Sequence, residues 1–180
     1  MVPLRLATAW LGGCSGCHMS FLDLDEFLID LAGKVELVFS PFIDVKEYPE
    51  DVDVVLIEGA VSNEDHLRLL LLIRARTRIV VSFGDCAVTG NVTALRNPFG
   101  EAEGVLRRVY LENGDRDARI PAAPGIVPAL LETVIPVHAI IQVDVFLPGC
   151  PPPAPRIRAV LEAILEGRTP HLTGEEIRFG

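Results

Sequence analysis

Near-continuous apolar runs alternate with amphipathic helical patterns along the chain, and this alternation limits the fold more than any other feature. The apolar runs cover residues 4–11, 35–40, 53–59, 78–84 and 139–149. Strands that are apolar on both faces are typical of parallel sheets with helices on either side. We therefore predict an α/β protein with a flavodoxin-like, doubly wound parallel sheet of about five strands in the order 2-1-3-4-5.

Apolar residues recur at helical spacing between several of these runs. In the first helical pattern, Ser20 with Asp23 resembles a capping box and predicts where the helix begins. Gly167 is a natural stop for the last helix. The expected helices lie near residues 21–31, 62–73, 101–110, 127–134 and 154–166.

The whole chain, residues 1–180, is expected to form a single domain, because its length suits one core and no repeat or linker divides it. Residues 85–138 are rich in glycine, proline and asparagine. A connection of this length is usually functional or bound to a partner. We therefore expect an irregular, partner-facing segment at about residues 85–138.

Composition excludes one class of function and points to another. The net charge of −9 disfavours a general nucleic-acid binder. Hydrophobic residues make up 49% of the chain, which is high for a free-standing acidic domain. Either the core is unusually large, or a broad face is buried against another subunit; obligate interfaces resemble a core cut in half, which favours the second reading.

No apolar run approaches the ~18 residues of a membrane-spanning helix. The first eleven residues show neither a twin-arginine pair nor the apolar region and cleavage site of a signal peptide. We expect a cytoplasmic protein without direct membrane insertion.

The chain has four cysteines, and each follows a predicted strand. Cys14 and Cys17 form a C-x-x-C after the first strand, Cys86 follows the fourth, and Cys150 follows the fifth. In a doubly wound sheet these loops share the carboxyl edge, where ligands bind at the switch in strand order. Four thiolates on one object leave two alternatives, a zinc ion or an iron–sulfur cluster.

The spacing and the surroundings of these cysteines favour the cluster. Structural zinc is usually held by two short C-x-x-C knuckles on a small ribbon, whereas here two ligands come from distant loops. Glycine-rich loops admit a bulky [4Fe–4S] cube and let backbone N–H groups approach its sulfides. The residues expected near the cluster, in secondary roles, are Gly13, Gly16, His18, Glu58, Asp85 and Gly149.

Two of these secondary residues have alternative roles. Glu58 could cap local backbone, hydrogen-bond across an interface, modulate the cluster or transfer protons. We interpret His18 as a solvated or interface residue rather than a ligand, because four thiolates already satisfy a cube.

Taken together, three motifs resemble the small subunit of [NiFe] hydrogenases. These are C-S-G-C at 14–17, G-D-C-A at 84–87 and P-G-C-P-P at 148–152, and the Glu-Gly pair at 58–59 is also similar. The resemblance implies that Cys14, Cys17, Cys86 and Cys150 bind one proximal [4Fe–4S] cluster. It also implies an obligate large subunit with the Ni–Fe centre, and no catalytic residue on this chain.

No cysteine follows Cys150, whereas many relatives carry further clusters. The chain therefore looks like the minimal small subunit of cytoplasmic, NAD(P)-linked, bidirectional hydrogenases. That resemblance implies partner subunits that hold further iron–sulfur clusters, FMN and NAD(P). FMN on this chain is possible, but no feature of the sequence requires it, because the loop that would cradle its phosphate carries Cys14 and Cys17.

Two alternatives remain open at this point. One is the cluster-bearing subunit of a complex I-like quinone oxidoreductase or membrane-bound hydrogenase, which shares the fold but typically begins with adjacent cysteines. The C-S-G-C spacing favours the hydrogenase. The other is a non-redox scaffold subunit stabilised by a Cys₄ zinc site.

Overall fold

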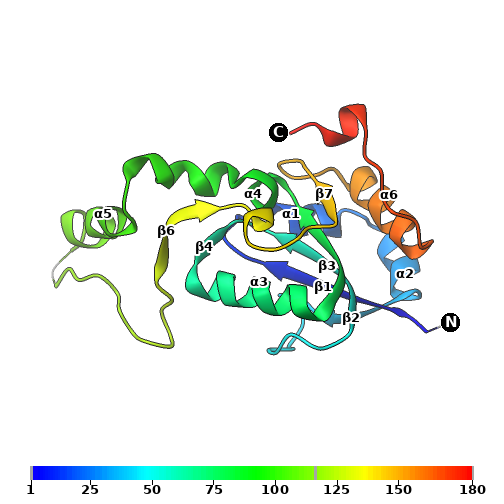
Figure 1. Cartoon of the computed structure of the whole chain (residues 1–180), viewed down its shortest axis with the longest axis horizontal. Helices are drawn as coiled ribbons and strands as arrows, with labels where there is room; N and C mark the ends of the chain where they lie inside the picture. Colours follow the sequence, from blue (N-terminus) through cyan, green and yellow to red (C-terminus); the bar gives the residue numbers. More distant parts are fainter. Residues whose placement is uncertain (1, 116, 180) are drawn as a thin grey trace.

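The centre of the protein is a parallel sheet of five strands, seen in a computed structural model that describes residues 2–115 and 117–179 (Figure 1). The strand order is β2-β1-β3-β5-β7, and every neighbouring pair is parallel. This order confirms the predicted doubly wound topology. The strands are β1 Leu4–Trp10, β2 Val35–Phe39, β3 Val52–Glu58, β5 Thr77–Phe83 and β7 Val145–Leu147.

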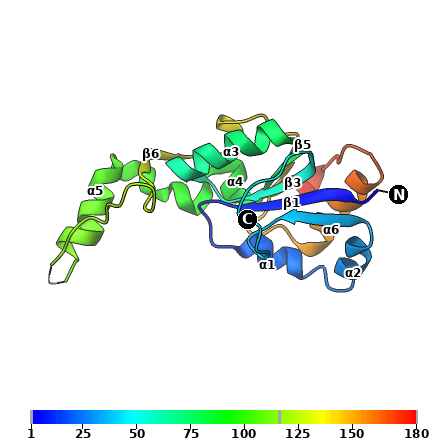
Figure 2. The same ribbon diagram turned by 90° about the horizontal axis from the view of Figure 1, so that it is seen from below.

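Helices cover both faces of this sheet, as Figure 2 shows. One core cluster joins the sheet to α1, α2 and α6, and the other joins it to α3 and α4. The central strand β3 is buried along almost its whole length, which explains its uninterrupted apolar sequence. The helices are α1 Gly16–Leu22, α2 Phe27–Ala32, α3 Glu64–Arg76, α4 Asp85–Thr89 and α6 Ala154–Leu165.

The segment between α4 and β7 extends away from the sheet at the end marked by α5 (Figure 1). It begins with a 3₁₀ helix and continues through α5 into a short π-helical turn. The chain then returns as β6, which pairs antiparallel with β4. The elements are β4 Val61–Asn63, η1 Asn91–Phe99, α5 Ala102–Arg107, η2 Arg108–Glu112, β6 Leu130–Ile135 and η3 Val137–Ala139, and a last turn, η4, spans Gly174–Ile177.

Three local predictions are wrong. The helix expected near 127–134 is largely replaced by the strand β6, because pairing with β4 supplies its hydrogen bonds. The first helix does not begin at Ser20 but at Gly16, inside the C-S-G-C motif. The apolar run 139–149 contributes only Val145–Leu147 to the sheet.

Helix α3 shows why other boundaries follow from the sequence. The Asn63 side chain accepts a hydrogen bond from the backbone N–H of His66 at 2.9 Å, which caps the helix. Acidic residues occupy its first turn and arginines its last, as the helix dipole favours.

Among the described residues, no helix is both long and apolar enough to cross a membrane.

Candidate iron–sulfur site

Three loops bring the four cysteines to the carboxyl edge of the sheet. Cys14 follows β1 and Cys17 lies in the first turn of α1. Cys86 lies in the first turn of α4, directly after β5, and Cys150 follows β7. Strands β1 and β3 flank the switch in strand order, and the three cysteine loops lie at the same edge of the sheet, where doubly wound folds bind ligands.

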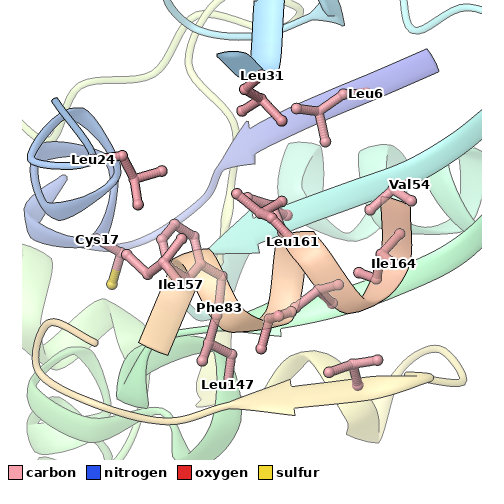
Figure 3. Packing of buried hydrophobic residues seen from close by; sticks show 14 of the residues in the cluster. Leu6, Cys17, Leu24, Leu31, Val54, Phe83, Leu147, Ile157, Leu161 and Ile164 are labelled. Carbon is pink, nitrogen blue, oxygen red and sulfur yellow. The ribbon is translucent and has the colours of Figure 1, made fainter. Parts of the chain in front are cut away.

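The loop after β5 lies directly against Cys17. A Cβ atom placed on Gly84 would be 2.1 Å from the sulfur of Cys17, and the φ angle of Gly84 is +84°. Figure 3 shows the Cys17 side chain at the end of the apolar cluster, beside Phe83 and Ile157. Only glycine fits at position 84, both for its backbone conformation and for the space that the thiol occupies.

The loops that carry Cys86 and Cys150 are tied together by two hydrogen bonds. The Asp85 backbone N–H donates to the carbonyl oxygen of Gly149 at 3.0 Å, and the Gly149 N–H donates to Asp85 Oδ1 at 2.6 Å. Asp85 is buried, so water competes little for these bonds. Each bond involves a residue adjacent to a cysteine, and the pair therefore fixes the relative position of the loops that carry Cys86 and Cys150.

Two further glycines leave room around the first cysteine pair. The Gly16 backbone N–H donates to the sulfur of Cys14 at 3.4 Å, and a Cβ on Gly16 would lie 3.2 Å from the same sulfur. A Cβ on Gly13 would lie 3.2 Å from the Cα of Gly59, so the β1 and β3 loops pass each other closely. The predicted glycines thus permit the close backbone packing around this site.

Glu58, at the carboxyl end of β3, contacts the backbone of the C-S-G-C motif. Its carboxylate accepts hydrogen bonds from the backbone N–H groups of Cys17 at 3.3 Å and His18 at 2.9 Å. These N–H groups belong to the first turn of α1, where a helix leaves its donors unsatisfied. Glu58 therefore caps α1 and holds the Cys17 backbone from a strand 41 residues away in sequence.

His18 is not solvated, contrary to the interpretation from the sequence. Its side chain is 2% exposed, and Nδ1 contacts Oε2 of Glu58. The ring makes edge contacts with Phe42 and Phe83, with centroid distances of 5.5 and 6.3 Å. Its Nε2 has no hydrogen-bond partner within the described part of the chain.

The pKa values of Cys17 and Cys86 are raised, in part by the neighbouring cysteines. Burial raises the pKa of Cys17 far above its usual range, and negative charge on Glu58 and the other three cysteines raises it further. Burial also raises the pKa of Cys86; hydrogen bonds with Thr93 lower it in part, while Cys150 and Cys14 raise it. Such thiols are poor thiolates until a bound metal takes the place of the proton.

This donor set fits an iron–sulfur cube. No three His, Cys, Asp or Glu side chains among residues 2–115 and 117–179 are grouped so that they could hold a metal ion. In a [4Fe–4S] cube each thiolate binds a different iron, so its ligands are spread more widely than those of one ion. The other three cysteines contribute to the raised pKa of Cys17, and the Gly84 backbone lies directly against its sulfur; both observations are compatible with that requirement.

Exposure of the cysteines is uneven. Cys17 is buried and Cys86 is half-buried, whereas Cys14 and Cys150 are exposed. A cluster here would be open to solvent or to a partner protein on one side and shielded by the apolar core on the other.

Thr93 was not predicted from the sequence as a neighbour of Cys86. It lies in the following 3₁₀ helix, and no local sequence signal marks it.

The fold and the cysteine placement define the class: a doubly wound α/β protein with four cysteines in the loops at the carboxyl edge of its sheet. Residues 14–164 match the family described as the NADH ubiquinone oxidoreductase 20 kDa subunit. This match covers most of the chain, and the chain belongs to this family. The family carries the name of the complex I subunit that was the predicted alternative.

Several relatives in this family are hydrogenase subunits. The chain is 44% identical to a subunit of the F420-non-reducing hydrogenase vhu of Methanococcus voltae, over 94% of this chain and 58% of the relative. It is 37% identical to the NAD-reducing hydrogenase HoxS subunit delta of Cupriavidus necator, over 92% of this chain and 80% of the relative. The chain therefore spans a little more than half of the first of these relatives and most of the second.

Solved structures of hydrogenase chains are also similar to this chain. A chain of an NAD⁺-reducing [NiFe]-hydrogenase in the H₂-reduced state superposes with a TM-score of 0.93 at 41% identity, and 99% of each chain is covered. A chain of the Ni-Fe-Se hydrogenase from Desulfomicrobium baculatum superposes with a TM-score of 0.55 at 19% identity, which shows a shared fold alone. The predicted resemblance to hydrogenase small subunits is confirmed.

Proposed function

We propose that this chain is the electron-transfer small subunit of an NAD(P)-linked [NiFe] hydrogenase. In this proposal Cys14, Cys17, Cys86 and Cys150 hold one proximal [4Fe–4S] cluster. The observation that supports it is that the four cysteines lie in three loops at the same edge of the sheet, with the sulfur of Cys17 against the loop that precedes Cys86. The relatives named as NAD-reducing hydrogenases support the reaction class.

When bound, such a cluster supplies one-electron transfer between partner sites. The chain's own residues hold and shield it. Glu58 fixes the backbone at Cys17, and the Asp85–Gly149 bonds fix the loops of Cys86 and Cys150. The core around Phe83 excludes water from the inner side of the site. The chain needs no catalytic residue of its own, because hydrogen would be split at the metal centre of the large subunit.

The partners in this proposal are a large subunit with the Ni–Fe centre and iron–sulfur and flavin subunits that exchange electrons with NAD(P). We place the large subunit against residues 85–138. There Val92, Leu95 and Phe99 of the 3₁₀ helix are 62%, 65% and 74% exposed. Such side chains are costly to leave in water, and Val92 and Leu95, three residues apart, lie on the same side of a 3₁₀ helix. The proposed location of the complex is the cytoplasm.

Two other functions remain candidates for experiment. A complex I-like oxidoreductase would use the same cluster with a quinone-linked partner, and the family name favours keeping it. A zinc scaffold would use the same cysteines without redox chemistry. Absorption near 400 nm that dithionite bleaches would identify the cluster and exclude zinc.

The test of the proposal uses the complex purified with all its subunits. Cys86→Ser should remove the small-subunit cluster signal from electron paramagnetic resonance spectra and abolish hydrogen-driven NAD(P) reduction. Ser82→Ala is the matched control, because Ser82 is buried at the end of β5 and its hydroxyl has no hydrogen-bond partner among the described residues. Full activity in the Cys86 variant would refute the proposal, and quinone-linked activity alone in the wild type would favour the complex I-like alternative.

A further inference from the structure

One guanidinium group joins the loop that carries Cys150 to the C-terminal segment of the chain. Arg156 lies in the first turn of α6, and its Nη1 donates to the carbonyl oxygen of Pro148 at 2.8 Å. The same nitrogen donates to the carbonyl of Arg178 at 3.2 Å, and Nη2 donates to that of Glu175 at 2.8 Å. A single side chain thus holds the ligand loop and the C-terminal segment together.

The charge of Arg156 is not neutralised by a described side chain. All three acceptors are peptide carbonyls, and no carboxylate within residues 2–115 and 117–179 forms an ion pair with it. Arg158, two residues further along the same helix, pairs instead with Glu162 at 2.8 Å. A guanidinium stays protonated at any physiological pH, and partial burial reduces screening by salt.

We propose that Arg156 is a positioning residue for the cluster: it fixes the Pro148–Cys150 loop and places a positive charge beside it. This inference rests on the proposed function, because it concerns the cluster that Cys150 would bind. Reduction adds negative charge to a cluster, and a nearby cation stabilises the reduced form. Net charge and hydrogen bonding around the sulfurs set the potential of such clusters. Loss of Arg156 is therefore expected to lower the midpoint potential.

The test compares three variants in the complete complex. Arg156→Gln removes the charge and keeps an amide that can still donate, whereas Arg156→Lys keeps the charge. Arg158→Gln is the matched control, since it removes one arginine from the same helix at a side chain that is 53% exposed. Redox titration followed by electron paramagnetic resonance gives the midpoint potential of the small-subunit cluster in each.

The expected result is a lower midpoint potential in R156Q, a value near that of the wild type in R156K, and no shift in R158Q. An unchanged potential in R156Q, with the wild-type cluster signal present, overturns the role of Arg156 alone. A wild-type complex without a cube signal overturns the proposed function as well.

If R156Q does not assemble, a second measurement tests whether the contacts of Arg156 hold the Pro148–Cys150 loop. A chain that ends at Thr173 keeps Arg156 but loses two of its three carbonyl acceptors. Hydrogen exchange in a peptide covering residues 145–156 should then be faster than in the wild-type complex, because the loop is held less firmly. Unchanged exchange in that peptide would overturn the link between the C-terminal segment and the loop.

Discussion

Gly84→Ala perturbs the candidate site at a position where the structure defines the consequence. Gly84 has φ +84° and ψ 162°, a region that essentially only glycine occupies. A new Cβ would also lie 2.1 Å from the sulfur of Cys17, much closer than non-bonded atoms approach. Alanine therefore both strains the backbone and pushes the thiol away from its position.

The two effects can be given magnitudes. Backbone strain of this kind costs about 1–3 kcal/mol, and overpacking in a close-packed interior costs about 1–3 kcal/mol. Their sum is about 2–6 kcal/mol, a large part of the roughly 5–15 kcal/mol that stabilises a typical protein. Because the displaced group is a proposed ligand, loss of iron should accompany the loss of stability.

The assay is scanning calorimetry of the assembled complex, together with iron per complex. Gly104→Ala is the control, because Gly104 is inside α5 and, apart from the adjoining helix backbone, no heavy atom of the described residues lies within 4 Å of a Cβ placed there. That change should leave the iron content intact and stabilise the helix by up to about 1 kcal/mol. If the Gly84 variant unfolds at the wild-type temperature with full iron, the account of this loop is wrong.

Three further predictions concern the rest of the chain. Burial lowers the pKa of His66 below 6.5. The contribution of the neutral histidine to the free energy of unfolding should therefore be complete above pH 6.5 and be lost as the pH falls toward the lowered pKa. His66→Gln should weaken this pH dependence in urea titrations. Burial raises the pKa of Tyr48 to about 12. Tyr48→Phe should lower the free energy of unfolding in urea by about 1–3 kcal/mol, because the buried Thr77 hydroxyl loses its hydrogen-bond partner at 2.5 Å. The chain expressed alone should aggregate, given its 49% hydrophobic residues, and a stable monomer in size-exclusion chromatography would contradict the inferred interface.

The sheet was predictable because its strands carry strong local signals. Residues 53–59 and 78–84 are almost wholly apolar, and the parallel pairing of buried strands follows from that pattern. The strand β6 was not predictable in the same way. Its partner β4 has only three residues, Val61–Asn63, and the two strands are about seventy residues apart in sequence.

The candidate site likewise has features that the sequence predicts and features that depend on distant contacts. Each cysteine follows a strand, so topology alone places the four at one edge. The Glu58–His18 contact joins residues 40 apart, and nothing local distinguishes a buried histidine from a solvated one. The start of α1 was misplaced for the same reason, since its cap comes from Glu58 and not from a neighbouring side chain.

The central claim is that four thiolates of this chain bind one iron–sulfur cube, and anomalous diffraction from crystals of the assembled complex tests it most directly. Data collected on either side of the iron edge should show a compact group of four iron atoms bounded by the sulfurs of Cys14, Cys17, Cys86 and Cys150. A single peak with the zinc edge instead, or iron ligated by other residues, would contradict the account.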